Sequence, residues 1–294
     1  MGFLSLLLLS LTAVAEVAPP PAGSSGASPT ETAEPAAGET GDSGACPATG
    51  SLLEELDGLG LERASRTRRF EAAVPEELYR KALERAGRPA IDRIGKRGFA
   101  VLYSDLPVEA WWRAINADER HVGYLPIDHS LPIEGASGTD GRRILQRAQR
   151  FGVGRYWISR YQSNEELFRA SEGGLWELWF ELDLRDDDLR REEVREAANG
   201  LQPMRQLRGA WLLTPLGDSC LLVEQFSWSE AGGTVGAFEA MALEGSMRTA
   251  ITGMERLARE MSRDPEIAAD DGGKLKRPDG KPLQGAGQPA APAP

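Results

Sequence analysis

The segment at 235–261 constrains the fold more than any other part of the chain. Its apolar residues recur at intervals of three and four, which places them on one stripe of a helix at about 100° per residue. The stripe contains Leu243, Met247, Ala250, Ile251, Met254, Leu257, Ala258 and Met261. Charged residues fall mostly off it. A long helix with one continuous apolar face must bury that face against something broad, such as a sheet.

The segments before this helix supply a sheet. Short turns join some of them, at Gly152-Val153-Gly154 and at Gly217-Asp218. The strands are expected at 98–103, 126–134, 142–151, 154–163, 174–184, 209–216 and 219–228. A helix over 107–116 and a short helical piece over 117–122 follow the first strand. The sequence therefore predicts an α+β fold, in which a curved antiparallel sheet wraps around a long C-terminal helix.

Three segments of the chain resemble the corresponding segments of one known superfamily. Residues 106–126 resemble its first-strand exit and paired helices, 209–230 its last hairpin, and 232–260 its closing helix. Over 98–262 the chain thus resembles the START/polyketide-cyclase-like superfamily, also called SRPBCC, which has a helix-grip fold. The resemblance implies a cavity between sheet and helix that holds a sterol, phospholipid, polyketide or other apolar molecule. This superfamily has no universal catalytic set, so no catalytic residue is transferred.

The side chains expected to face that cavity come from the strands and from the last helix. Methionine is flexible and polarizable, which suits irregular ligands, and aromatic rings supply large contact areas with few rotatable bonds. The predicted ligand-binding residues are Tyr103, Trp157, Trp176, Leu178, Phe180, Glu224, Phe226, Met247, Ile251 and Met254. Packing is the alternative for both groups, since methionines can simply fill a core and rings can close a cavity.

Side-chain parity decides which strand residues face inward. Trp176 and Phe180 share one parity and alternate with acidic residues, so we expect them to face the helix. Glu224 shares its parity with Phe226. If that face is inward, Glu224 is a buried carboxylate that holds a ligand hydroxyl or acts as a general acid. A partner such as Arg155 would make it structural instead.

The two histidines, His121 and His129, are the remaining candidates for chemistry. With Asp128 they suggest a metal or acid–base site, but zinc requires three well-placed ligands. The stretch between the histidines also crosses a helix end and Pro126. We expect polar loop residues here, with no metal and no cofactor. Nucleophile, dinucleotide-binding and phosphate-binding motifs are absent from the sequence in the context that they require.

The two ends of the chain have compositions that do not favour folding. The first fifty residues lack Lys and Arg and are rich in Ala, Pro, Gly, Ser and Thr, and the end of the chain is similar. An apolar run followed by Ala13-Val14-Ala15 indicates a cleaved signal that is too short to span a bilayer. The expected parts are a signal peptide at 1–15, a disordered linker at 16–50, an N-terminal helical extension at 51–97, the helix-grip domain at 98–262 and a disordered tail at 263–294. We therefore expect export to a periplasm or to the outside of the cell.

Charge and cysteine content limit the kinds of partner and of cross-link that we expect for this chain. The formal net charge of −11 leaves no basic footprint, so nucleic acid is not expected. A charged insert at 185–208, in which Val194 and Ala197 are among the few apolar positions, is expected to be a solvated surface excursion. The two cysteines, Cys46 and Cys220, imply no disulfide framework.

Three functions fit these features. The first is exported, non-catalytic binding or transport of a hydrophobic, lipid-like ligand in an internal cavity. The second is a cyclase, dehydratase or hydrolase on the same fold, which needs polar residues inside the cavity. The third is a protein-interaction module whose cavity is filled. They are separated by whether the space under the last helix is empty and by which side chains line it.

Overall fold

The computed structural model describes the chain from residue 74 onward, with gaps. The described residues are 74–85, 87–150, 153–172, 174–216, 220–231, 236–264 and 275–283. The predicted signal peptide, the linker at 16–50 and the helices expected over 51–73 lie outside them.

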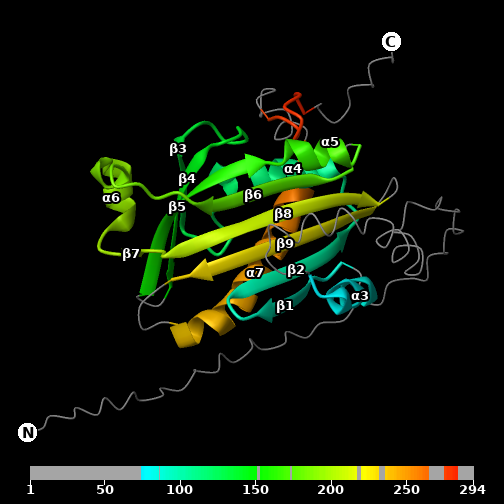
Figure 1. Cartoon of the computed structure of the whole chain (residues 1–294), viewed down its shortest axis with the longest axis horizontal. Coiled ribbons are helices and arrows are strands. Elements are labelled where there is room, and N and C mark those ends of the chain that lie inside the picture. The colour runs from blue at the N-terminus through cyan, green and yellow to red at the C-terminus, as the bar shows by residue number, and fades with distance from the viewer. Residues whose placement is uncertain are drawn as a thin grey trace, which may run out of the picture. The chain divides into compact units, whose positions relative to one another are not determined.

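One sheet forms the centre of the described structure (Figure 1). The spatial order of its strands is β1-β2-β9-β8-β6-β5-β4-β3, with antiparallel pairing throughout, and β7 adds a short parallel pairing to β5. The strands are β1 Ala90–Ile94, β2 Arg97–Ser104, β3 His129–Glu134, β4 Arg143–Arg150, β5 Val153–Ser163, β6 Trp176–Leu182, β7 Gln202–Pro203, β8 Gln206–Leu216 and β9 Cys220–Glu230. Most pairs join strands close in sequence, but β2 pairs with β9.

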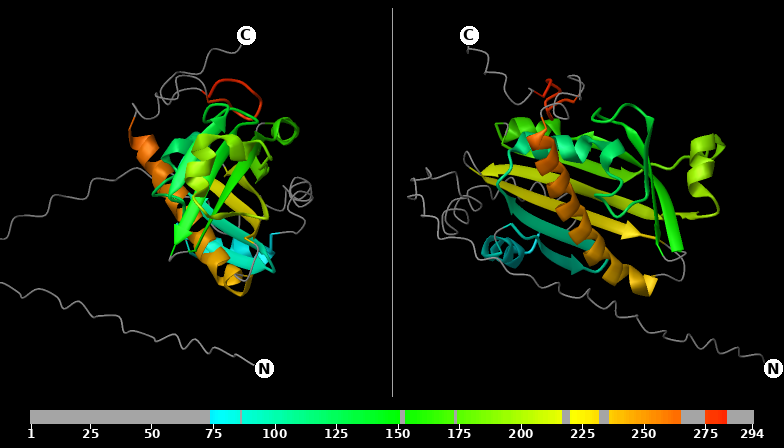
Figure 2. Two further views of the ribbon diagram at one scale, coloured as in Figure 1. Left: turned by 90° about the vertical axis from the view of Figure 1, so that its left-hand side faces the viewer. Right: turned by 180° about the vertical axis from the view of Figure 1, so that it is seen from behind.

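One long helix, α7, crosses a face of this sheet (Figure 2). The predicted apolar stripe is the buried side of α7, and Met247, Ile251 and Met254 are at most 2% exposed. The helices are α3 Glu76–Glu84, α4 Val108–Asn116, η1 Asp118–Arg120, α5 Glu165–Ala170, η2 Asp188–Arg190, α6 Glu192–Ala198 and α7 Gly236–Arg263. Within the described ranges, none of them has the length and apolarity needed to cross a bilayer. The architecture is the α+β helix-grip fold that the sequence predicts.

The opposite face of the sheet is covered as well. Leu78 and Tyr79 of α3 pack there against apolar residues of β2, β8 and β9. The Tyr79 hydroxyl donates a hydrogen bond to Oε1 of Glu224, at 2.6 Å. The central strands are therefore buried on both faces, which removes the alternation of apolar and polar residues that normally marks the inner face.

The helical extension predicted over 51–97 is wrong at its C-terminal end. Helix α3 follows Pro75, as predicted, but residues 90–94 form strand β1, which pairs with β2 through a tight turn. Gly95 in this turn has φ +64°, a left-handed conformation that glycine adopts without steric cost. Pairing with β2 therefore determines the structure of this segment.

The charged insert at 185–208 covers the outer face of β4 and β5, so the expectation of a solvated excursion is wrong. Val194 and Ala197 give α6 a small apolar face, which is buried against these strands. The guanidinium of Arg143 forms an ion pair with the carboxylate of Asp188, and both side chains are 1% exposed. The insert is thus anchored by packing and by charge.

Part of the predicted tail folds back onto the core. Leu275 and Leu283 are each 5% exposed and belong to the apolar cluster under α7. Nε1 of Trp112 donates a hydrogen bond to the carbonyl of Lys276, at 2.7 Å. The prediction of disorder is therefore wrong for 275–283, where two leucines anchor a segment of otherwise polar composition.

Cys220, at the start of β9, takes part in a disulfide bond, which the sequence did not lead us to expect. The chain contains two cysteines. The other one, Cys46, lies outside the described residues.

Candidate functional site

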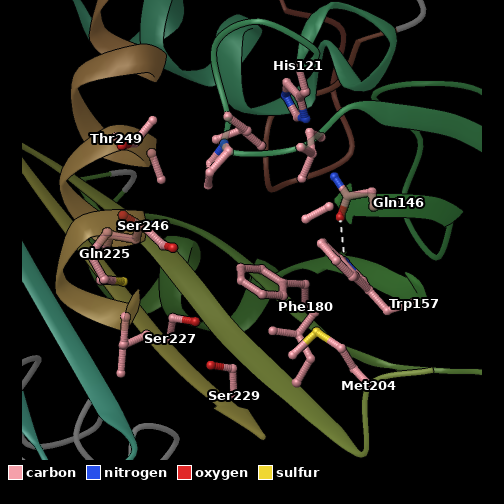
Figure 3. Close-up of a pocket in the computed structure, with 18 of the residues that line it drawn as sticks. His121, Gln146, Trp157, Phe180, Met204, Gln225, Ser227, Ser229, Ser246 and Thr249 are labelled. Atoms are coloured by element: carbon pink, nitrogen blue, oxygen red, sulfur yellow. Dashed lines mark hydrogen bonds between the residues drawn. The ribbon is translucent and has the colours of Figure 1, made fainter. Parts of the chain in front are cut away.

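A cavity of about 550 Å³ lies between α7 and the sheet (Figure 3). Its walls come from α7, from β4, β5, β6, β8 and β9, and from the loop after η1. Sites that enclose one small organic molecule typically have volumes of roughly 300–1,000 Å³. Met247 and Met254 line the cavity on the side of α7, so the space between the apolar stripe and the sheet is hollow. A filled cavity, which the protein-interaction alternative requires, is not what the structure has.

The predicted ligand-binding residues fall into three groups. Those that line the cavity are Trp157, Phe180, Met247 and Met254. Those buried between sheet and α7 that do not line it are Trp176, Leu178 and Ile251. Those on the opposite, α3-covered face are Tyr103, Glu224 and Phe226. The predicted parity thus holds for β6 and is reversed on β9.

The inward residues of β9 are the odd-numbered ones. Gln225, Ser227 and Ser229 line the cavity, whereas Glu224 points to the other face, toward Tyr79. The parity predicted for Glu224 is wrong because both faces of β9 are buried. Apolar residues therefore occur on both faces, as Leu222 and Val223 do, and do not reveal which face is inward.

Gln146 on β4 lies in an aromatic corner of the cavity. Its Oε1 accepts hydrogen bonds from Nε1 of Trp157, at 2.9 Å, and from the hydroxyl of Tyr161, at 3.2 Å. Because an indole N–H can only donate, the amide oxygen must face these rings. The rings of Tyr161 and Phe180 lie 5.5 Å apart, centroid to centroid. The amide nitrogen of Gln146 consequently points away from the rings (Figure 3).

His121 lines the same end of the cavity and is 3% exposed. Its Nε2 lies 3.0 Å from the carbonyl oxygen of Ala114. A carbonyl only accepts, so Nε2 carries the proton and the neutral ring keeps Nδ1 as an acceptor. Burial lowers the pKa of His121, and the nearby carboxylate of Asp118 offsets this only in part. The imidazole is therefore neutral at pH 7.

A buried ion pair lies beside this corner. Nε of Arg142 is 2.5 Å from Oδ2 of Asp118, and Nη2 is 3.2 Å from Oδ1. The two side chains are at most 1% exposed. The guanidinium also lies over the Tyr161 ring, 4.8 Å from its centroid. The positive charge of Arg142 is thus neutralised inside the protein, as a buried charge must be.

The cavity has little charge of its own. Among the described residues that line it, Arg155 alone is formally charged at neutral pH. Its Nε donates to the carbonyl of Ala231 at 2.9 Å, and its Nη1 donates to the carbonyl of Gly154 at 2.8 Å. The remaining polar groups in the walls are amides, hydroxyls and the neutral imidazole. Such walls suit an uncharged ligand, because an unpaired buried charge is costly.

His129 and Asp128 do not line the cavity. Asp128 accepts from Nε of Arg147 at 2.7 Å, and His129 is half-buried on β3. Over the part of the chain that is described, no three His, Cys, Asp or Glu side chains are grouped so as to bind a metal ion. Of the three candidates for catalysis, Glu224 and His129 therefore lie outside the cavity and His121 lies in its wall.

One wall of the cavity is a loop held against α7. Residues 125–127 of this loop line the cavity. Nη2 of Arg256 donates to the carbonyl of Gly123 at 2.7 Å, and its guanidinium lies over the Tyr124 ring. A Cβ atom at Gly253 would lie 1.9 Å from the Tyr124 carbonyl oxygen. Only glycine lets the loop backbone approach the helix this closely.

Sequence reasoning missed the polar part of the site. Gln146, Gln225 and the two serines of β9 come from strands far apart in the chain, and their residue types are common on any strand. One weak signal existed for Gln146. It shares its parity with Ile144 and Ala148, which marks it as inward on its strand.

Comparison with known proteins finds similar solved structures, each at low sequence identity. No protein-family model and no curated protein matches the chain. Among solved structures, human STARD10 is 9% identical with a TM-score of 0.47, covering 65% of this chain and 83% of its own. A STAR-related lipid transfer protein fragment from Xanthomonas axonopodis is 11% identical with a TM-score of 0.45, covering 57% and 91%. The Zhui aromatase/cyclase from Streptomyces sp. R1128 is 12% identical with a TM-score of 0.38, covering 57% and 93%.

The strand order, the position of α7 and the hollow between them define a helix-grip protein with an internal cavity. This is the α+β helix-grip fold that the sequence predicts. The identities are too low to transfer a function, so function is argued from the cavity.

Proposed function

We propose that the protein is an exported, non-catalytic carrier that holds one hydrophobic ligand between α7 and the sheet. The observation that carries this proposal is the cavity of about 550 Å³. Apolar and aromatic side chains supply most of its walls, and burial of apolar ligand surface there contributes roughly 25 cal/mol per Å². A few uncharged polar groups orient the ligand, as is typical of small-molecule sites.

Two observations support export. The apolar run before Ala13-Val14-Ala15 has the length and small-residue ending of a cleaved signal. The disulfide at Cys220 is of a kind that persists in oxidising compartments and is rare in the cytosol. The test is the intact mass of the protein from its native host under non-reducing conditions. We expect the mass of a chain that starts near residue 16 and has lost two hydrogen atoms through disulfide formation. A full-length, fully reduced chain would contradict export.

The binding role is tested by extraction and by fluorescence. The purified protein is extracted with organic solvent and the extract is analysed by mass spectrometry. A broad panel of apolar compounds is then titrated while the emission of Trp157 and Trp211, which line the cavity, is followed. We expect a copurified compound or saturable quenching. The absence of both an extracted compound and a fluorescence change across the panel would count against binding.

A matched pair of variants shows whether the ligand occupies this cavity. Ala250→Phe places a ring in the cavity wall, whereas Arg248→Phe places the same ring on the exposed side of the same helix. We expect ligand to be lost from the first variant and retained by the second. Equal retention would place the ligand elsewhere on the molecule.

The catalytic alternative keeps one supporting observation, the neutral His121 in the cavity wall. A cyclase or dehydratase that uses it as a base changes the mass of its ligand or rearranges its bonds. Prolonged incubation of the protein with the extracted compound, followed by mass spectrometry and NMR, separates the two functions. An unchanged compound supports a carrier, and a converted one supports an enzyme.

A further inference from the structure

Two glutamine side chains are deeply buried polar groups of the cavity wall. Gln146 on β4 is 3% exposed and Gln225 on β9 is 7% exposed. They lie on opposite sides of the cavity (Figure 3). A buried amide that is left without partners costs free energy, so unused hydrogen-bonding capacity at these positions indicates polar groups in the ligand.

The hydrogen-bonding capacity that Gln146 leaves unused is the donor capacity of its amide nitrogen. Its Oε1 already accepts from Nε1 of Trp157 and from the hydroxyl of Tyr161. The Trp157 N–H cannot accept, so the amide cannot be turned around without breaking that bond. Among the described residues nothing accepts a hydrogen bond from the amide nitrogen, so both of its N–H bonds are left for a partner on the cavity side. That partner must be an acceptor.

The unused capacity of Gln225 includes its oxygen. Oε1 of Gln225 is buried and has no hydrogen-bond partner among the residues that the structure describes. The neighbouring inward positions of the strand are Ser227 and Ser229, whose hydroxyls can donate or accept. This side of the cavity can therefore meet a second polar group of either kind.

The surroundings of Gln146 decide the charge of the acceptor. His121, at the same end of the cavity, is neutral, and its Nε2–H is directed at the carbonyl of Ala114. The guanidinium of Arg142 is bound to Asp118. The guanidinium of Arg155, the charged group of the described lining, is directed at the carbonyls of Ala231 and Gly154. A carboxylate placed beside Gln146 would therefore be a buried anion that is not directly paired with a cation, which is unfavourable. A ketone, ester or hydroxyl oxygen meets the same N–H groups without that cost.

We propose that the ligand is an uncharged, oxygen-bearing apolar molecule whose carbonyl or hydroxyl oxygen accepts a hydrogen bond from the amide nitrogen of Gln146. This rests on the proposed function and narrows its ligand class. Ionised fatty acids and pure hydrocarbons are expected to bind more weakly. The first puts a bare charge beside Gln146, and the second leaves its amide unpaired.

The test uses two matched sets of compounds, one linear and one polycyclic. The linear set is 2-pentadecanone, pentadecane and tetradecanoate, and the polycyclic set is cholestanone, cholestane and a cholenic acid. Affinities are measured by quenching of tryptophan emission at pH 7.5. In at least one set we expect the ketone to bind about tenfold or more tightly than the other two members, which is the size of one well-placed hydrogen bond.

Two glutamine variants on one strand assign the preference. Gln146→Met removes the donor and keeps a side chain of similar length. Gln149→Met makes the same exchange at an exposed position on the outer face of β4. The ratio of ketone to hydrocarbon affinity should fall to about one in the first variant and stay at the wild-type value in the second. Because the readout is a ratio within one variant, partial loss of folded protein does not alter it.

Each outcome bears on the proposal. Equal binding of the three members of a set, or tighter binding of the acid, overturns the ligand class and leaves the carrier function standing. An undiminished ratio in Gln146→Met overturns the role of this residue. Failure of all six compounds to bind counts against both the ligand class and the carrier function.

Discussion

Replacing Gly253 by alanine tests whether the loop wall of the cavity is as tightly seated on α7 as the structure has it. At a solvent-exposed position within a helix, replacing glycine by alanine stabilises the folded protein by about 0.8–1 kcal/mol, since alanine is the better helix former. At Gly253 the new Cβ would lie 1.9 Å from the carbonyl oxygen of Tyr124 and 2.7 Å from its carbonyl carbon. Both are backbone atoms, which cannot rotate out of the way.

The loop must therefore move, and the cost can be worked from its contacts. Overpacking of this kind costs about 1–3 kcal/mol. Displacement also weakens the hydrogen bond from Arg256 to Gly123, which in this exposed setting is worth about 1 kcal/mol. Set against the gain in helix propensity, the net result is a loss of about 1–3 kcal/mol for Gly253→Ala.

The same helix provides the control. A Cβ at Gly245 meets nothing within 4 Å, so Gly245→Ala should gain about 1 kcal/mol. In urea unfolding followed by tryptophan emission, the two midpoints should differ by about 1 M or more for an m-value near 2 kcal/mol/M. If both variants raise the midpoint equally, the close seating of the loop is refuted.

Three further predictions concern stability. The pKa of His121 is lowered in the folded state, so the unfolded chain binds the proton more readily. The stability that neutral His121 contributes is therefore present above about pH 6.5 and is lost as the pH falls below that. A difference in stability between wild type and His121→Gln that grows in favour of wild type on acidification would contradict this. Asp188→Asn removes one of three carboxylates that pair with Arg143 and leaves those of Glu134 and Asp183, so it should cost about 1.5–3 kcal/mol in urea unfolding. Leu275→Ala should cost about 2–5 kcal/mol, whereas Leu189→Ala, at a 49% exposed position, should change stability by less than about 0.5 kcal/mol; equal effects would mean that the 275–283 segment is not part of the core.

The elements that the sequence predicts well are those with one buried face. Helix α7 carries a clear period because one side meets the core and the other does not. On strand β6 the acidic residues Glu177 and Glu181 mark the second face, and Phe180 lies where its parity places it. Strand β9 has no such period. With α7 on one face and α3 on the other, Leu221 and Leu222 are both fully buried, and neither identifies the inner side. Glu224 was misplaced for that reason.

The candidate site was predicted only in its apolar part. Large aromatic residues and methionines are usually buried, so Trp157 and Met254 could be proposed as cavity-lining residues from their type and spacing. Gln146 became recognisable only once Trp157 and Tyr161 were seen to occupy its oxygen. That arrangement joins two strands and depends on register, which residue type alone does not specify. The anchoring of 275–283 depends likewise on a distant partner, Trp112.

The pairing of β2 with β9 has a consequence for how quickly the native state is reached. Phe99 lies opposite Phe226, so this ladder cannot form until almost all of the intervening chain has been gathered. Loop-closure entropy opposes such distant pairing, and chains rich in it fold in milliseconds to seconds rather than in microseconds. Stopped-flow refolding monitored by tryptophan emission should therefore show its main phase on that slower scale. Variants that weaken this ladder should retard refolding if the ladder forms in the rate-limiting step, and should chiefly hasten unfolding if it forms afterwards.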